Sequence, residues 1–181
     1  MGEWRIVRLD RGHVREGFDC GKPSLDDFLR VLVGQYEKRN LGRTYVALDG
    51  GNPRVLGYYT LASGALDAES LPAKQAKKLP RHPLPVILLA RLAVDRSVQG
   101  TGLGGFLLRD ALTRSLGLSE ELGIHAVVVD ALDAEARAFY QRFGFSTLTD
   151  DEMRLFLPVS TIRAAANPSH QTRPSGPGQA Q

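Results

Sequence analysis

The chain has 181 residues, enough for one domain with a sizeable core, and an apolar share of 43% excludes disorder along its whole length. A net charge of +3 makes it mildly basic, which is compatible with an acidic partner but does not indicate one. One cysteine excludes an internal disulfide, and neither a signal peptide nor a membrane-spanning apolar run is visible, so we expect a cytoplasmic protein that does not bind membranes.

The N-terminal part predicts a strand followed by a helix. Apolar and polar residues alternate over Trp4–Leu9, which favours an edge or half-buried strand. Ser24 stands where a helix N-cap belongs, and apolar residues at helical spacing continue to Tyr36. We therefore expect a helix that ends near Asn40.

A hairpin and a basic loop come next. Arg43–Leu48 and Val55–Ala62 predict two antiparallel strands joined by a turn at Asp49–Pro53. Ser63–Pro85 is rich in lysine and proline. It predicts a fixed loop that contains a short helix within Ala68–Leu79.

The centre of the chain combines a buried strand, a polar turn and a glycine-rich helix start. Val86–Val94 is apolar except for Arg91, as is typical of a strand covered on both faces. Asp95–Ser97 turns the chain, and Gln99–Gly104 then brings bare backbone to the start of a helix. Unpaired N–H groups at such a helix start favour an anion, so this stretch predicts a phosphate site.

The remaining elements complete the predicted sheet. In chain order we expect a helix from Leu103 to near Gly117, a strand over Ile124–Val129, a helix from the N-cap Asp133 to Gly144, and short strands over Phe145–Leu148 and Met153–Leu157. From Ala164 onward the Pro, Ser, Gln and Gly content predicts disorder. The whole pattern predicts a single α/β domain with a mixed sheet over residues 1–160 and a disordered tail over 164–181.

The type of phosphate site can be narrowed. No Lys-Ser/Thr follows the glycines, which excludes a P-loop, and the strict G-x-G-x-x-G spacing is absent. The stretch instead resembles the pyrophosphate loop of the GNAT acetyltransferases, whose pattern is Gln/Arg-x-x-Gly-x-Gly/Ala. Gln99, Gly102 and Gly104 occupy the three defined positions of that pattern. The resemblance implies the fold of that family and a loop that binds acetyl-CoA through Gln99, Gly100, Thr101, Gly102, Leu103 and Gly104. A glycine-rich turn without a ligand is the alternative.

A second resemblance concerns the segment from Ala136 to Phe145. It is similar to the GNAT segment in which a tyrosine faces the acetyl-CoA sulfur, which implies that Tyr140 is the general acid. A thiol has a pKa of roughly 8.5 and a tyrosine roughly 10, so proton transfer to the CoA thiolate is nearly thermoneutral. The alternative is a half-buried aromatic residue near a helix end. The resemblance also implies that backbone N–H groups of Leu92, Ala93 and Val94 hold the pantetheine and polarise the thioester.

A glutamate base, which many GNAT enzymes carry on the central strand, is absent from Val86–Val94. A lysine amine, with a pKa of roughly 10.4, arrives protonated, whereas an α-amine, with a pKa of roughly 7.7–8.0, is largely ready. The missing base therefore favours an α-amine acceptor. The histidines lack metal-ligand spacing, so we expect no metal.

Four further segments, Phe18–Gly21, Arg43–Val46, Gly57–Gly64 and Leu89–Asp95, extend the resemblance to the acetyltransferase toxins of bacterial toxin–antitoxin pairs. Those toxins acetylate the α-amine of aminoacyl-tRNA and stop translation; they are usually homodimers neutralised by a ribbon-helix-helix antitoxin. The resemblance implies the same substrate and partners here. The candidate contacts to tRNA phosphates are Arg39, Arg43, Lys74, Lys77, Lys78 and Arg81. A solvated basic surface is the other explanation of these charges.

Two other functions stay open at this point. One is an acetyltransferase for a small-molecule amine or a protein N-terminus, from which strong salt dependence of substrate binding would distinguish a tRNA enzyme. The other is a non-catalytic acyl-CoA sensor or nucleic-acid-binding module, which the presence of Tyr140 opposes.

Overall fold

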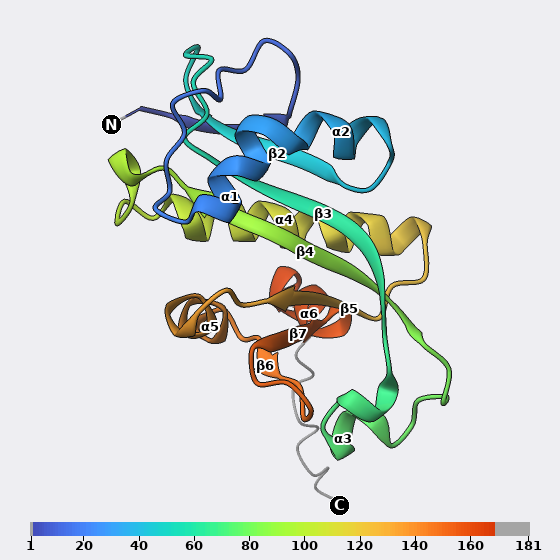
Figure 1. Ribbon diagram of the computed structural model, residues 1–181. Helices are drawn as coiled ribbons and strands as arrows, with labels where there is room; N and C mark the ends of the chain where they lie inside the picture. Colours follow the sequence, from blue (N-terminus) through green and yellow to red (C-terminus); the bar gives the residue numbers. More distant parts are fainter. Residues whose placement is uncertain (1, 169–181) are drawn as a thin grey trace, which may run out of the picture.

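The computed structural model describes residues 2–168, which form a seven-stranded mixed sheet flanked by helices (Figure 1). The strand order is β1-β2-β3-β4-β5-β7-β6, and only the β4–β5 pair is parallel. The strands are β1 Trp4–Arg8, β2 Arg43–Asp49, β3 Gly57–Leu66, β4 Leu84–Val94, β5 Ala126–Asp130, β6 Ser146–Thr147 and β7 Arg154–Pro158. The predicted α/β class with a mixed sheet is confirmed.

Helices cover both faces of the sheet. They are α1 Pro23–Asp27, the π-helical segment η1 Phe28–Leu32, α2 Val33–Lys38, α3 Ala73–Ala76, α4 Leu103–Glu121, α5 Ala134–Arg142 and α6 Val159–Ala166. Short 3-10 turns lie at Ala68–Ser70 and Arg96–Val98. The predicted short helix of the basic loop corresponds to α3. None of the helices within residues 2–168 is both long and apolar enough to cross a membrane.

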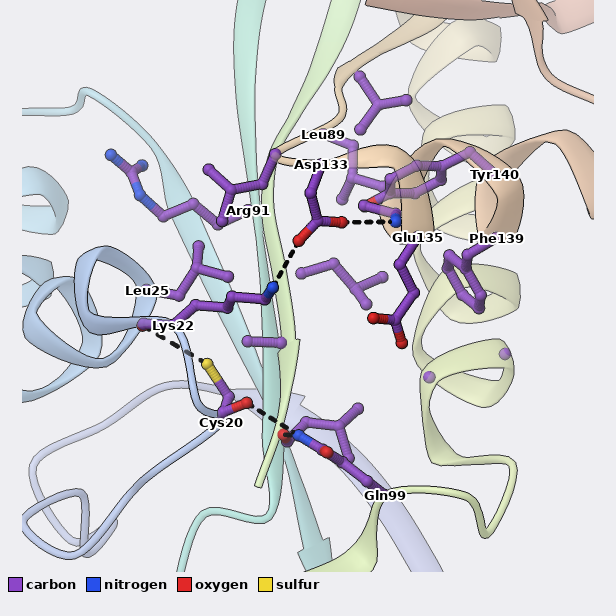
Figure 2. A pocket seen from close by; sticks show the side chains of 18 of the residues that line it. Cys20, Lys22, Leu25, Leu89, Arg91, Gln99, Asp133, Glu135, Phe139 and Tyr140 are labelled. Carbon is purple, nitrogen blue, oxygen red and sulfur yellow. Dashed lines mark hydrogen bonds and ion pairs between the residues drawn. The ribbon is translucent and has the colours of Figure 1, made fainter. Parts of the chain in front are cut away.

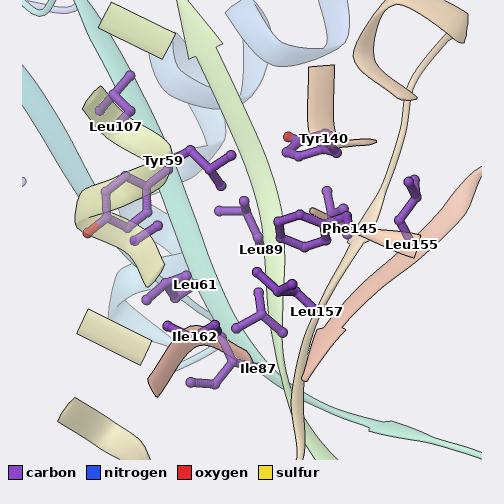
Figure 3. Packing of buried hydrophobic residues seen from close by; sticks show 14 of the residues in the cluster. Tyr59, Leu61, Ile87, Leu89, Leu107, Tyr140, Phe145, Leu155, Leu157 and Ile162 are labelled. Carbon is purple, nitrogen blue, oxygen red and sulfur yellow. The ribbon is translucent and has the colours of Figure 1, made fainter. Parts of the chain in front are cut away.

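The period of two along the strands divides the core between the faces of the sheet. Val46 and Tyr58 pack with Phe28 and the rest of the α1–α2 run. Their neighbours Ala47 and Tyr59 pack instead with α4, in a cluster that extends to α5, α6 and β7 (Figure 3). The helical segment Pro23–Lys38 and the helix α4 therefore pack on opposite faces of the sheet around β4.

A bulge in β4 creates the opening in the sheet. Thr60 lies opposite Arg91 and Leu61 opposite Leu89, so Ala90 is an extra residue on β4. Such a bulge bends its strand. β4 pairs with β5 only over Val86–Leu89, and the remainder of β4 diverges from β5 (Figure 1). The edge of β4 beyond Leu89 is therefore not paired with β5.

Two helix boundaries differ from the predictions. The cap of α1 is Lys22 with Pro23 at the first helical position, so the prediction of Ser24 as N-cap was wrong. Proline suits that position because its fixed φ is helical and it lacks an N–H group that would stay unpaired. The helix α4 continues beyond Gly117 to Glu121, because the roughly 1 kcal/mol cost of one exposed glycine does not end a helix whose other face is buried.

The C-terminal end holds a helix that the sequence pattern did not reveal. α6 packs Val159 and Ile162 into the core and includes Ala164–Ala166. The predicted tail therefore begins too early at Ala164. Residues 169–181 of that tail lie outside the described part of the chain.

Candidate active site

A cavity of about 700 Å³ lies where β4 and β5 diverge (Figure 2). Its walls come from four parts of the chain: β4 beyond the bulge, the glycine loop that leads into α4, the start of α1, and α5. Elements far apart in sequence thus meet at one site. The size suits a ligand larger than a free amino acid.

The glycine loop presents bare backbone to this cavity. Gly100 and Gly102 have φ values of 77° and 92°, in the left-handed region that favours glycine. Gly102 is the N-cap of α4, and the Phe106 N–H donates to its carbonyl at 3.1 Å. The N–H groups of the preceding turn stay outside the helical ladder. The loop therefore has the donor set of an anion site, and it fits the pyrophosphate of acetyl-CoA.

Gln99 ties this loop to the rest of the site. Its side-chain amide donates to the backbone carbonyls of Cys20 and Val94, each at 2.9 Å. The amide donors are therefore used by the protein itself. Gln99 therefore holds the loop in position, and Gly100, Gly102 and Gly104, which follow it, line the cavity.

Asp95 fixes the turn before the loop. Its carboxylate is buried and accepts from the N–H groups of Asp19 and Ser97, with Arg54 at 3.3 Å. Burial alone would raise the pKa of Asp95, but the bonds from Ser97 and the Asp19 N–H, together with Arg54, hold it below its usual range. Asp95 stays ionised at neutral pH and anchors both segments.

Tyr140 lies in α5, which also lines the cavity. It is 5% exposed and packs edge-on against Phe145 with ring centroids 5.6 Å apart, at the border of the core cluster (Figure 3). Burial raises the pKa of Tyr140 above the ordinary value. The phenol therefore carries its proton at neutral pH, as a general acid must.

Burial at the cavity wall disfavours the ionised form of the Cys20 thiol. Its thiol lines the cavity, and burial, with Asp26, raises its pKa to about 11. The Cys20 thiol therefore keeps its proton at neutral pH and is not activated as a nucleophile.

An ion pair joins the two sides of the cavity mouth. Lys22, at the start of α1, lies 2.5 Å from Asp133, which caps α5 by accepting from the Ala136 N–H at 2.8 Å (Figure 2). The prediction of Asp133 as N-cap is confirmed. The hydrogen bond between the two side chains raises the pKa of Lys22 and lowers that of Asp133.

Most of the predicted cofactor residues line the cavity. They are Leu92, Ala93, Val94, Gln99, Gly100, Gly102 and Gly104, together with Tyr140. Two side chains point elsewhere. The Thr101 hydroxyl donates to the Val98 carbonyl, and Leu103 is buried in the core under α4. These two positions have only backbone groups to offer a ligand.

The candidate tRNA contacts lie away from the cavity in two groups. Lys74, Lys77, Lys78 and Arg81 are exposed around α3, at the far end of the β3–β4 pair (Figure 1). Arg39 and Arg43 lie after α2 instead. Arg43 is held by Glu37 and Asn40, whereas Arg39 is exposed.

Three cations of the cavity wall were not predicted as site residues from the sequence. They are Lys22, Arg91 and Arg142. They come from different elements and no spacing connects them, so only the fold brings them together. Among residues 2–168, no group of three or more His, Cys, Asp or Glu side chains is arranged to hold a metal ion.

The fold and the site define an acetyltransferase. Residues 40–147 match the model of the acetyltransferase (GNAT) domain. The chain therefore belongs to the GNAT family and is an acetyl-CoA-dependent N-acetyltransferase.

Its relatives include bacterial toxins. A tRNA-acetylating toxin of Mycobacterium tuberculosis is 43% identical over 147 residues, which are 81% of this chain and 87% of the relative. A crystal structure of a tyrosine-to-phenylalanine mutant of KacT is 34% identical with a TM-score of 0.86, covering 90% of this chain and 98% of KacT. AtaT in complex with acetyl-methionyl-tRNAfMet is 32% identical with a TM-score of 0.85, covering 91% of this chain and 99% of AtaT.

Proposed function

We propose that this acetyltransferase is a toxin that acetylates the α-amine of aminoacyl-tRNA and so blocks translation. The observation that carries the proposal is one cavity lined both by a bare glycine loop and by a protonated, buried Tyr140. Resemblance to a tRNA-acetylating toxin and to an AtaT complex with acetylated aminoacyl-tRNA supports this acceptor.

The residues take distinct roles in this reaction. Acetyl-CoA, when bound, supplies an acetyl thioester. Backbone N–H groups from Gly100 to Gly104 bind its pyrophosphate, and those of Leu92 and Val94, which face the free edge of β4, orient the thioester, whereas the Ala93 N–H points to β3. Tyr140 gives its hydroxyl proton to the sulfur that leaves when the amine attacks.

The carboxylates around the cavity do not lie on the central strand. Asp133 is used by Lys22, Asp130 lies 3.2 Å from Arg154 on the neighbouring strand, and Glu135 is exposed in the first turn of α5. The part of β4 that faces the cavity carries no carboxylate. An amine that is largely neutral at physiological pH needs no such base.

The assembly follows from the same resemblance. We propose a cytoplasmic homodimer without a metal, neutralised by a ribbon-helix-helix antitoxin. A solved structure of a relative holds AtaT with the C-terminus of its antitoxin AtaR and acetyl-CoA. The exposed cations around α3, with Arg39 and Arg43, are the surfaces that we assign to tRNA phosphates.

Mass spectrometry of total aminoacyl-tRNA, incubated with the enzyme and labelled acetyl-CoA, tests the proposal directly. We expect a labelled acetyl group on the α-amine of one or a few amino acids released from tRNA. Label that appears only on small amines or protein N-termini, with none in the tRNA fraction, would contradict the proposal and favour an ordinary amine acetyltransferase.

The pH profile should show only an acidic limb. Activity is expected to rise with pH until the acceptor α-amine loses its proton near roughly pH 8 and then to stay level up to about pH 10. The upper limb is absent because burial raises the pKa of Tyr140, which keeps its proton through this range. Initial rates of acetyl transfer between pH 6 and 10 check this. A decline between pH 8 and 9 would mean that another acid donates the proton.

Reversing the charge of Lys74, Lys77 and Lys78 together should weaken tRNA binding and flatten its salt dependence, since each neutralised phosphate contact contributes about one unit of slope. Acetyl-CoA binding should not change, because these residues lie outside the cavity. Binding isotherms at several salt concentrations measure both effects. An unaltered slope would make this surface an ordinary solvated one.

A further inference from the structure

Arg91 carries a positive charge that no side chain among residues 2–168 neutralises. It lies on β4 directly after the bulge, is half-buried and lines the cavity. Within residues 2–168 its guanidinium has no carboxylate in ion-pair range and no hydrogen-bond acceptor. By contrast, Lys22 in the same wall is paired with Asp133. A half-buried cation without a counter-charge is costly, which indicates an anion supplied by a ligand.

The guanidinium is nevertheless held in place. Its central carbon lies 3.7 Å from the ring centroid of Phe28 and 5.2 Å from that of Tyr36. Phe28 is buried in η1 and cannot move aside easily. Stacking fixes the plane of the guanidinium but leaves the N–H groups at its edge free, the geometry that binds phosphate oxygens in pairs.

A second stacked arginine shows that stacking alone does not explain this arrangement. Arg114 lies 4.0 Å from the ring centroid of Tyr45, yet it also donates to the Tyr59 hydroxyl at 2.9 Å and contacts Asp110 at 3.3 Å. Arg114 is outside the cavity, and its charge is neutralised within the fold. Arg91 has the aromatic support of Arg114 without the internal partner.

The position of Arg91 separates it from the phosphate site of acetyl-CoA. The glycine loop, Phe139 and Arg142 gather at the α4–α5 side of the cavity. Arg91 extends toward the other side, where α1 and η1 cover the sheet (Figure 2). An acceptor has to reach the thioester from the side that the CoA phosphates do not occupy, so the α1 side is the acceptor side.

We propose that Arg91 binds the phosphate group next to the 3′-terminal nucleoside of the charged tRNA and so places the aminoacyl ester against the thioester. This inference rests on the proposed function and adds the residue that recognises the acceptor end. Arg91 is thereby an acceptor-binding residue on the wall opposite the glycine loop.

The experiment combines a change in the protein with a change in the substrate. Arg91→Gln should raise the KM for the aminoacyl-tRNA found by mass spectrometry by roughly 10- to 100-fold, the size expected for a lost hydrogen-bonded charge pair. The Kd of acetyl-CoA and kcat should stay within about threefold. The substrate probes are 3′-O-aminoacyl-adenosine with and without a 5′-phosphate.

The two probes distinguish recognition from support of the fold. The phosphate should improve kcat/KM for the wild type and not for Arg91→Gln, while without it the two proteins should be equal. Arg114→Gln is the matched control, expected to lose thermal stability but keep the benefit of the phosphate. Arg91→Lys keeps the charge, serves if the glutamine variant does not fold, and should retain part of the benefit.

Two results would overturn the inference. One is an unchanged KM in Arg91→Gln, and the other is an equal loss on both adenosine probes. Either can occur while the wild type still labels tRNA, so failure of this inference is distinguishable from failure of the proposed function. Absence of label in the tRNA fraction with the wild type would instead contradict both the proposed function and this inference.

Discussion

Tyr140→Phe is expected to lower the turnover number by roughly 10²- to 10⁴-fold, the usual contribution of a general acid. The ring remains and continues to pack against Phe145, so the fold and the cavity wall should persist. The Kd of acetyl-CoA should therefore stay within a few-fold of wild type, as calorimetry can measure. Single-turnover kinetics then place the loss on the chemical step.

Tyr45→Phe provides the control for the loss of a phenol. Tyr45 stacks on Tyr59 with ring centroids 5.2 Å apart and does not line the cavity. Its hydroxyl has no assigned role, so this variant should turn over normally. If the turnover numbers of Tyr140→Phe and Tyr45→Phe are equal, another group gives its proton to the sulfur and Tyr140 is not the general acid.

Gly102→Val should lower acetyl-CoA affinity by roughly 10- to 100-fold through lost hydrogen bonds to a charged group. At φ 92° a valine is strained, and its Cβ projects into open space within the cavity wall. Relief of the strain moves the N–H groups of the helix start away from the anion. Calorimetric titration with acetyl-CoA measures the effect.

Gly50→Val separates strain from binding. Gly50 also has positive φ and open space where a Cβ would lie, but it belongs to the β2–β3 turn, outside the cavity. This variant should lose stability and keep its affinity. Gly104→Val gives a second test in the loop, where its Cβ meets Phe139 and Val94 at ordinary contact distances. Normal affinity in both loop variants would place the phosphate site elsewhere.

The sequence predicted the elements whose signal is local. Glycines at positions 100 and 102 adopt positive φ, Asp133 caps α5, and Gly144 with φ 92° follows the end of that helix. Each of these depends on the conformation that one residue prefers, which propensity describes well. The positions of most strands along the chain could likewise be predicted from runs of apolar residues.

The sequence did not reveal features that depend on contacts between distant segments. α6 is eight residues long with two buried side chains, too weak a period to distinguish from a loop. The bulge at Ala90 follows from pairing with β3, and the stacking of Arg91 on Phe28 follows from the way α1 and η1 cross the sheet. Within its own segment Arg91 was only an interruption in an apolar strand.

The pairing of Lys22 with Asp133 has a consequence for ionic strength. Their side chains are 45% and 35% exposed, so salt screens the pair, whereas the ladder that joins β4 to β5 over Val86–Leu89 is insensitive to it. Salt should then loosen the mouth of the cavity without opening its base. We expect ligand exchange to become faster with salt while capture of a polyanion becomes weaker, so turnover measured against salt concentration should pass through a maximum.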